Sequence, residues 1–333
     1  MMATVFDVAK EAGVSIATVS RVMNNSPRVS AATAEAVRAA VEKLGYVPNQ
    51  QARNLRKSES NAILVMIPDV TKLSYARTLA GINEKAQEYG YTLLMNNAVG
   101  EEQELVLNRM AESQRCAGAI LLNVMLDDCW LPEVDSKLPL VLCSEYVRGC
   151  EVPSVSVDDR QIGREAADCL LELGHRRIGY IGSTVNCSSA VERKEGFAEK
   201  LREAGIEADI RLVDYMDVSS NYREGRRVAR EILDSPDHPS AIFCYGDILA
   251  MAAVTVAGEL GIRVPEQLSV LGVDNNVYAE MVHPYVTSFS QPFEEMGRRA
   301  MELLHLKMTG QNVPGQREIA VHELKLQEST GPA

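Results

Sequence analysis

Several side chains near the N-terminus have the types and the spacing that contact with the edges of DNA bases would require. Read as a helix, residues 14–22 place Ile16, Ala17 and Arg21 on one face, opposite a face of valines. A bare isoleucine beside an alanine gains nothing from water, but either side chain can contact the methyl group of thymine. Arg21 can donate two hydrogen bonds to the acceptors of guanine. This short stretch therefore has the chemistry needed to read bases in a DNA major groove.

Three short helices can be placed around this stretch. Thr4 begins a T-x-x-D capping box that starts the first helix, and Gly13 ends that helix. Ser15 caps the second helix. Ser30 caps a third helix, which ends at Gly45. A helix, a tight glycine turn and a second helix form a helix-turn-helix, in which the second helix reads DNA. A plain three-helix bundle is the alternative.

The charge of the chain changes sign near residue 60. The whole chain has a net charge of -12, but residues 1–60 carry eight Lys or Arg against five Asp or Glu, a net charge of +3. A basic tip on an acidic body is the distribution that phosphate groups select. This local charge favours the helix-turn-helix over the plain bundle.

The stretch that follows the third helix, 49–57, is long enough for only about two helical turns, and so short a helix is marginal in water. It carries one large apolar residue, Leu55, among Arg53, Arg56 and Lys57. A leucine surrounded by cations suits insertion between base pairs from the minor groove. The alternative is a plain linker whose leucine packs on the core, although Lys57–Ser60 already supplies a linker.

Residues 4–57 contain the run VFDVAKEAGVSIATVSRVMNNSPRVS and, after it, LGYVPNQQARNLR. These runs resemble the DNA-binding head of the LacI/GalR family of bacterial transcription regulators. The resemblance implies that Ile16, Ala17 and Arg21 reach base edges. It also implies that two hinge helices, one per subunit, insert Leu55 at the central CG step of a palindromic operator. The resemblance places Ser15, Thr18, Ser20 and Asn24 on phosphates. The full set of residues expected to contact DNA is Thr4, Ser15, Ile16, Ala17, Thr18, Ser20, Arg21, Asn24, Asn49, Ala52, Arg53, Leu55 and Arg56.

From residue 61 apolar strands alternate with amphipathic helices, which predicts parallel sheets with crossover helices. Five residues of one helix recur 115 positions later, with Gly81 matching Gly196, and this repeat indicates two similar halves. The expected strands are 62–67, 92–95, 119–122, 140–143 and 155–157, then 177–181, 210–213, 241–244, 268–272 and 287–289.

The family resemblance implies a body with the two-lobed fold of periplasmic sugar-binding proteins. The expected fold class is an all-α helix-turn-helix head plus an α/β periplasmic-binding-protein-like core of two doubly wound parallel-sheet lobes. We expect a DNA-binding domain (1–48), a hinge helix and linker (49–60), and an effector-binding and dimerisation core (61–333). The N-lobe is expected at about 61–158 and 291–320, and the C-lobe at about 159–290 and 321–333, with crossings near Asp158, Ser290 and Ala320.

Polar residues at the expected strand ends predict a ligand site, because ligands of such sheets bind beyond the carboxyl ends of the strands. Asp274 ends one strand, and Arg193 lies on a helix that follows another. An aspartate and an arginine that converge can hold a pair of hydroxyls by forked hydrogen bonds. A helix-capping aspartate and a surface arginine are the alternatives, and Asp247 is expected to cap its own helix.

The resemblance implies ligand roles for Ser189, Arg193 and Asp274. Departures from the family pattern leave Tyr75 as the aromatic wall, and Gly246 stands where an asparagine is frequent. Many sugar-responsive members have an aspartate where this chain has Ser144-Glu145-Tyr146, and the segments SEY and FCYGD resemble the cytidine-repressor branch. A sugar and a nucleoside are therefore both open as effectors. The expected effector-binding residues are Ser74, Tyr75, Ser189, Arg193, Met216, Gly246 and Asp274.

Other function classes lack their motifs. The chain has no G-x-S-x-G, P-loop or H-E-x-x-H motif, and its five histidines are isolated, so neither an enzyme nor a cofactor is expected. Seven cysteines without a C-x-x-C pair indicate reduced thiols and no zinc site. With neither a secretory signal nor a membrane-spanning run, the chain is expected in the cytoplasm.

The expected function is that of a ligand-responsive transcription repressor. It is expected to act as a homodimer on double-stranded DNA, since the C-terminal sequence has no leucine-heptad tail. The alternatives are a sugar-binding or transport-type binding protein without a DNA role, and an enzyme on the same two-lobed fold.

Overall fold

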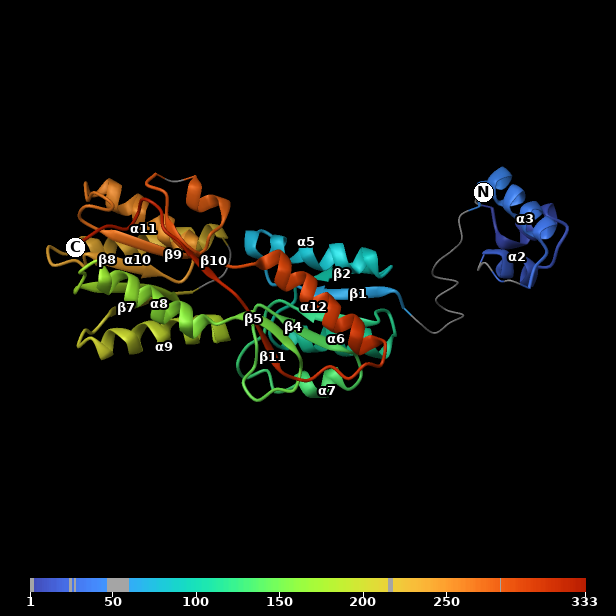
Figure 1. Cartoon of the computed structure of the whole chain (residues 1–333), viewed down its shortest axis with the longest axis horizontal. Helices are drawn as coiled ribbons and strands as arrows, with labels where there is room; N and C mark the ends of the chain where they lie inside the picture. The colour runs from blue at the N-terminus through green and yellow to red at the C-terminus, as the bar shows by residue number, and fades with distance from the viewer. Residues whose placement is uncertain (1–2, 24–25, 27, 47–59, 215–217, 282) are drawn as a thin grey trace. The chain divides into compact units, whose positions relative to one another are not determined.

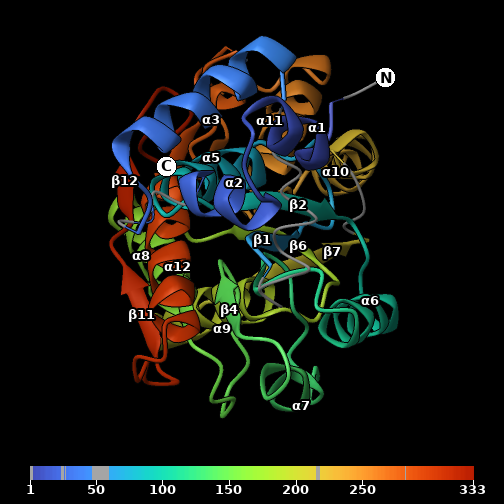
Figure 2. The same cartoon turned by 90° about the vertical axis from the view of Figure 1, so that its right-hand side faces the viewer.

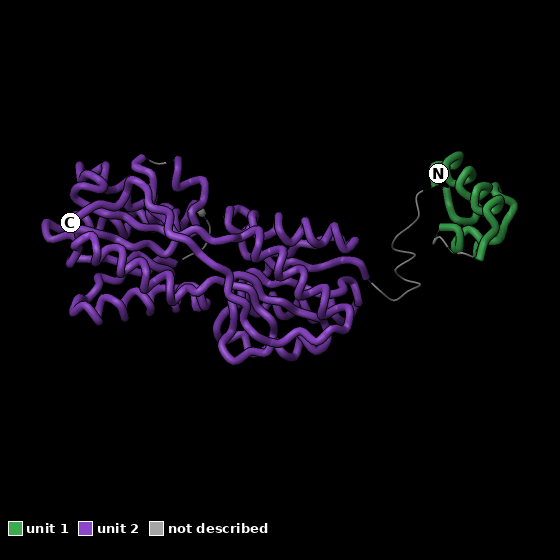
Figure 3. Tube along the Cα trace, in the orientation of Figure 1, with its two compact units in different colours: residues 1–59 green, residues 60–333 purple. Residues whose placement is uncertain are grey.

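The computed structural model describes residues 3–23, 26, 28–46, 60–214, 218–281 and 283–333. The chain forms two compact units, Met1–Glu59 and Ser60–Ala333 (Figure 3). Among the described residues, no helix is both long enough and apolar enough to cross a membrane.

The first unit contains the helices α1 (Val5–Glu11), α2 (Ile16–Met23) and α3 (Ala31–Leu44). Each predicted N-terminal cap is present. The Thr4 backbone N–H donates to the Asp7 carboxylate (2.8 Å) in a capping box, and the Oγ of Ser15 and of Ser30 accept backbone N–H groups of their own helices. Gly45 ends α3 with a φ of +58°, a left-handed conformation that favours glycine. The predicted three-helix head is therefore confirmed.

The second unit contains two six-stranded sheets (Figure 1). In the first lobe the strand order is β11-β5-β4-β3-β1-β2, and in the second it is β12-β10-β9-β8-β6-β7. The first-lobe strands are β1 (Ala62–Met66), β2 (Thr92–Asn96), β3 (Gly118–Leu121), β4 (Leu140–Cys143), β5 (Ser154–Val157) and β11 (Arg317–Ala320). The second-lobe strands are β6 (Ile178–Ser183), β7 (Asp209–Val213), β8 (Ala241–Cys244), β9 (Ser269–Asp274), β10 (Thr287–Ser290) and β12 (Glu323–Lys325).

All ten predicted strands are present, with their ends shifted by at most two residues. The predicted parallel pairing is confirmed for these strands, and one antiparallel pair, of β12 with β10, lies at the edge of the second sheet. The strands β11 and β12 were not predicted. The chain passes from the first sheet to the second after Val157, returns after Ser290 and crosses again after Ala320.

Helices cover both faces of the first sheet, and the alternation along β1 shows how. Ile63 and Val65 join a buried cluster with residues of α5 (Leu73–Glu88) and α12 (Phe293–Met308). Leu64 and Met66 join a second cluster with residues of α6 (Glu101–Glu112) and α7 (Leu131–Asp135) (Figure 2). Successive side chains of a strand point to opposite faces, so a strand buried on both faces is apolar throughout.

The second lobe has the helices α8 (Asp159–Glu172), α9 (Ser188–Glu203), α10 (Val218–Leu233) and α11 (Asp247–Glu259), and the short 3-10 helix η1 (Val277–Glu280). The pair α8 and α9 packs closely, as α5 and α12 do in the first lobe (Figure 1).

Glycines set the spacing of both helix pairs. A Cβ atom on Gly81 would lie 1.9 Å from the carbonyl oxygen of Glu294, and one on Gly196 would lie 2.1 Å from that of Arg160. Their counterparts on the partner helices, Gly297 and Gly163, are equally close to backbone carbonyls. The repeated Gly81 and Gly196 of the sequence therefore occupy equivalent contacts between two helices.

Candidate functional sites

The exposed face of α2 carries the side chains predicted to read bases. Ala17 and Arg21 are exposed, whereas Val19 and Val22 are buried in the core of the head. Ile16 differs from the prediction of a bare isoleucine, because it is half-buried and packs against that core. The sequence periodicity placed it on the outer face, but its position in the first turn lets it reach inward as well.

The residues predicted to hold phosphates are placed only in part. Ser15 is exposed and its Oγ lies 2.9 Å from the Oγ1 of Thr18, so the two hydroxyls share a hydrogen bond. Thr4 is exposed and its hydroxyl donates to Asp7 (2.7 Å), while Ser20 is half-buried. The predicted DNA contacts that lie outside the described residues are Asn24, Asn49, Ala52, Arg53, Leu55 and Arg56.

A cavity lies where the carboxyl ends of strands from both lobes meet. It encloses about 410 Å³ of space free of atoms, its open mouth included. Five of the seven predicted effector residues line it, namely Ser74, Tyr75, Ser189, Arg193 and Asp274. Gly246 begins α11 as its N-cap but is not part of the lining, and Met216 lies outside the described residues.

A larger cavity, with about 950 Å³ of space free of atoms when its open mouth is included, adjoins the first. The two share Lys72, Tyr75, Glu145 and Tyr245 in their linings. The larger cavity adds apolar side chains, among them Val99 and Met125, which the smaller cavity lacks. A ligand that fills both cavities would meet a polar end and a more apolar end.

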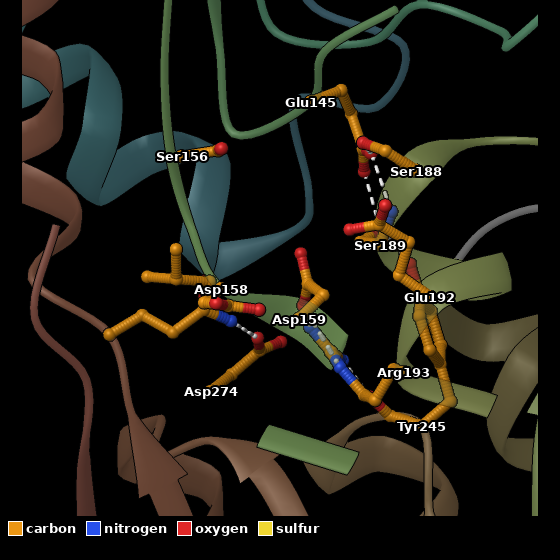
Figure 4. A network of polar contacts seen from close by, with 12 residues as sticks. Glu145, Ser156, Asp158, Asp159, Ser188, Ser189, Glu192, Arg193, Tyr245 and Asp274 are labelled. Carbon is orange, nitrogen blue, oxygen red and sulfur yellow. Dashed lines mark hydrogen bonds and ion pairs between the residues drawn. The ribbon is translucent and has the colours of Figure 1, made fainter. Parts of the chain in front are cut away.

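Arg193 is the central cation of the smaller cavity. Its side chain is only 4% exposed, and its Nε and Nη2 donate to the carboxylate of Asp159 (3.1 Å from Nε). Its Nη1 donates to the carbonyl of Tyr245, and its guanidinium lies 4.8 Å from the centre of that ring. Arg193 and Asp274 do line one cavity, but the fork of the arginine is already engaged by Asp159 (Figure 4).

Burial raises the pKa of two aspartates of this cavity. It raises the pKa of Asp159 to about 6, more than the positive charge of Arg193 lowers it. Burial also raises the pKa of Asp274, against the opposing charges of Lys72 and Arg193. Carboxyl groups with raised pKa values beside a buried guanidinium are characteristic of functional sites.

Asp274 sits on an unusual backbone. Its φ is +104°, in the left-handed region, and its Oδ1 accepts a hydrogen bond from the Nε2 of Gln291 (2.8 Å). Strained residues of this kind cluster at binding sites, where the surrounding structure holds the side chain in place.

Asp247 does not cap its own helix, so that prediction was wrong. Gly246 is the N-cap of α11, without a side-chain cap. The carboxylate of Asp247 instead accepts hydrogen bonds from the backbone N–H of Asn276 (2.7 Å) and the hydroxyl of Ser288 (2.5 Å). Asp247 therefore ties the loop after β9 to β10, and burial raises its pKa well above the ordinary value.

Several lining residues were not predicted. The signal for Glu145 and Asp159 was present, because each follows a buried strand, but the sequence did not show which strand ends share a lobe interface. The lining residues missed are Lys72, Ser144, Glu145, Asp159, Tyr245, Gln291 and Phe293. No group of His, Cys, Asp and Glu side chains within the described ranges could hold a metal ion.

Comparisons with known proteins cover both units. Residues 4–49 match the family model of bacterial regulatory proteins, lacI family, and residues 167–330 match that of a periplasmic binding protein-like domain. The HTH-type transcriptional repressor CytR of Escherichia coli (strain K12) is 33% identical over 330 residues, which cover 98% of this chain and 96% of that protein. Catabolite control protein A of Priestia megaterium is 31% identical and covers 99% and 100% of the two chains.

Solved structures agree along the length of the chain. The lac repressor dimer bound to operator and the anti-inducer ONPF has a TM-score of 0.88 at 26% identity, covering 99% of this chain and 100% of that chain. The complex of the transcriptional regulator CelR with cellobiose has a TM-score of 0.72 at 33% identity, covering 98% and 99%.

A helix-turn-helix head joined to a two-lobed core with a cavity between its lobes defines a ligand-responsive transcription regulator. The chain belongs to the LacI family of bacterial regulatory proteins.

Proposed function

We propose that this chain represses transcription by binding a palindromic operator as a homodimer in the cytoplasm. We propose further that a sugar or nucleoside in the interlobe cavity changes its affinity for that operator. The observation that carries the second proposal is the lining of the cavity, which combines a buried guanidinium, three carboxylates and the rings of Tyr75, Tyr245 and Phe293. Charged groups hold hydroxyls by strong hydrogen bonds, and aromatic rings pack on the faces of sugars and bases.

The relatives support the DNA-binding part of the proposal. CytR is named as a transcriptional repressor, and the lac repressor structure is a dimer on its operator. In this chain α2 presents Ala17 and Arg21 outward, where a base-reading helix needs them. One head covers few base pairs, so two heads on two half-sites are needed for high affinity. We include the insertion of Leu55 into the minor groove in this proposal.

The cavity suggests how ligand and DNA binding are coupled. Ser74 and Tyr75 belong to the first lobe, whereas Arg193 and Asp274 belong to the second. A ligand that contacts both pairs binds best at one angle between the lobes, so it shifts the population toward that angle. The CelR relative holds cellobiose in its structure, which supports a sugar-like ligand here. Operator titrations with and without the ligand measure whether it releases or strengthens DNA binding.

The test is a thermal-shift screen of sugars and nucleosides against the wild type and the variant Asp274→Asn. Asparagine keeps the shape of the side chain and tolerates the left-handed backbone. A ligand at 100 times its Kd stabilises the folded core by about 2.7 kcal/mol, which is a measurable rise in Tm. We expect Asp274→Asn to weaken that ligand at least tenfold. The matched control is Asp234→Asn, which changes an exposed aspartate outside the cavity linings. A ligand that binds both variants as tightly as the wild type would refute the site.

A further inference from the structure

Glu145 reaches from the first lobe to the start of a helix in the second. It follows β4, and its side chain is buried with only 6% exposed. Its Oε2 accepts hydrogen bonds from the Oγ of Ser188 (2.5 Å) and the backbone N–H of Ser189 (2.9 Å). Its Oε1 accepts a third from the Oγ of Ser189 (2.5 Å) (Figure 4). One carboxylate thus receives three donors from the first turn of α9.

The start of α9 is a place that selects a negative charge. The first backbone N–H groups of a helix have no partner within the helix, and the helix dipole is positive there. The N-cap of α9 is Cys187, which makes no side-chain cap, and the first turn holds no acidic residue. The carboxylate that accepts the backbone N–H of Ser189, one of these groups, comes instead from the other lobe. The structure therefore shows an anion-binding helix terminus whose anion is part of the chain itself.

Glu145 lies where a ligand in either cavity would contact it. It lines both the smaller and the larger cavity, and so does Tyr245, whose hydroxyl lies 2.9 Å from the Oγ of Ser189. Three acidic and two basic side chains line the smaller cavity. A phosphate or carboxylate on a ligand would face the Glu145 carboxylate at close range and would find the Ser189 N–H and the hydroxyls of Ser188 and Ser189 already bonded to it. Like charges at such distances in a buried site repel strongly.

The loop that carries Glu145 is also held by other contacts. The backbone N–H of Tyr146 donates to the Oγ of Ser188 (3.1 Å), and the guanidinium of Arg317 lies 3.9 Å from the centre of the Tyr146 ring. Arg148 donates to the carboxylate of Glu192 on α9 (3.1 Å). Removing the Glu145 side chain therefore leaves the loop tied to α9 by two contacts and to β11 by a third.

We infer that Glu145 determines specificity by filling the anion-binding end of α9, so that the effector is an uncharged polyhydroxylated molecule and its phosphorylated or carboxylated forms are excluded. This inference rests on the proposed role of the cavity as the effector site. The part that concerns Glu145 and α9, however, can be tested without knowing the effector.

The first experiment uses inorganic phosphate as the probe on the full chain. Thermal shift and calorimetric titration compare the wild type with Glu145→Ala, at constant ionic strength set with chloride. We expect a saturable phosphate site in Glu145→Ala, at least tenfold tighter than any phosphate binding by the wild type. The double variant Glu145→Ala/Ser189→Ala should lose this gain, since it lacks one of the donors. Glu133→Ala, which removes an exposed acid of the first lobe, is the control for the change in net charge.

Glu145→Gln keeps the shape of the side chain and serves if the alanine variant does not fold, as judged by circular dichroism. The glutamine side chain has no charge, but its amide oxygen still accepts a hydrogen bond from the start of α9. We therefore expect Glu145→Gln to bind phosphate more tightly than the wild type but less tightly than Glu145→Ala. Folded Glu145→Ala and Glu145→Gln proteins that bind phosphate no better than the wild type would overturn the inference.

The second experiment compares matched ligand pairs, such as ribose with ribose 5-phosphate and uridine with uridine monophosphate. One of these pairs should contain a compound that the wild type binds. For that pair, the wild type should bind the uncharged compound at least a hundredfold more tightly than its phosphorylated form. In Glu145→Ala the ratio of the two Kd values should be smaller. A wild type that binds a phosphorylated member more tightly would contradict the inference. If the wild type binds no ligand of either kind, the proposed effector role fails, while the phosphate titration still decides the role of Glu145 at α9.

Discussion

Replacing Arg193 by methionine tests how the buried charges of the cavity depend on one another. Methionine has a similar length but no charge, so Arg193→Met leaves the carboxylate of Asp159 buried without its main partner. Breaking a buried ion pair by removing one partner costs about 3–5 kcal/mol. For a unit as large as residues 60–333, each kcal/mol lowers the Tm by roughly 2–4 °C, so a fall of about 10 °C is expected at neutral pH.

The cost should depend on pH, and its sign follows from the pKa of Asp159. Burial raises this pKa from its ordinary 3.8 to about 6 in the folded protein. An acid with a raised folded pKa binds more protons when folded than when unfolded. Its ionisation therefore costs stability as the pH rises from about 4 through the folded pKa. Without the charge of Arg193, which lowers the pKa of Asp159, that pKa moves higher, and each further unit adds about 1.4 kcal/mol to the cost at high pH.

Calorimetry of the wild type, Arg193→Met and Arg193→Met/Asp159→Asn at pH 5 and pH 8 measures this dependence. We expect the penalty of the single variant to be larger at pH 8 than at pH 5. The double variant should recover part of the lost stability at pH 8 and should lose the part of the pH dependence that comes from Asp159, because that carboxylate no longer titrates. Equal penalties for the single variant at both pH values would refute the reasoning.

Two further predictions concern the head and the helix pairs. Leu55→Ala should leave fold and dimer intact but weaken specific operator binding at least tenfold in a gel-shift titration, and an unchanged affinity would contradict the proposed insertion. Gly163→Ala should lower the Tm of the core by several degrees, because the new Cβ would lie 2.1 Å from the carbonyl oxygen of Arg193. The matched control is Gly258→Ala in α11, where nothing lies within 4 Å and alanine should stabilise the helix by about 0.5–1 kcal/mol. Equal shifts in the two glycine variants would show that the close helix contact does not limit the side chain.

The parts of the fold that the sequence predicts are those that local physics determines. Thr4, Ser15, Ser30 and Gly45 satisfy backbone groups within a few residues of themselves, so the helix ends of the head can be read directly. Strands buried on both faces must be apolar along their whole length, which makes them visible as short hydrophobic runs.

The strands β11 and β12 could not be predicted, because they lack the apolar runs that mark the other strands. They are short, they are partly exposed, and they carry polar residues, so no periodic pattern distinguishes them from a loop. They are strands only because β5 and β10 offer open edges to pair with. An edge strand of this kind is determined by its neighbour rather than by its own sequence.

The hydrogen-bond and ion-pair partners of the cavity residues could not be predicted from the sequence either. Asp247 has the position of a helix cap, but its carboxylate is used by Asn276, which is 29 residues away. Arg193 has the position of a ligand-binding residue, but it is engaged by Asp159, which is 34 residues away. The sequence predicts some of the strand ends that face the cavity, but it does not show which acid pairs with which base.

The reciprocal glycine contacts have a consequence for the evolution of the chain. In each lobe the backbones of two helices touch, so no side chain between them can be exchanged to change their spacing. The cavity residues Tyr75, at the start of α5, Glu145, after β4, and Asp274, at the end of β9, lie outside these close helix contacts. Substitutions of cavity residues can therefore change which ligand binds, while the packing of the two helix pairs and the architecture stay the same.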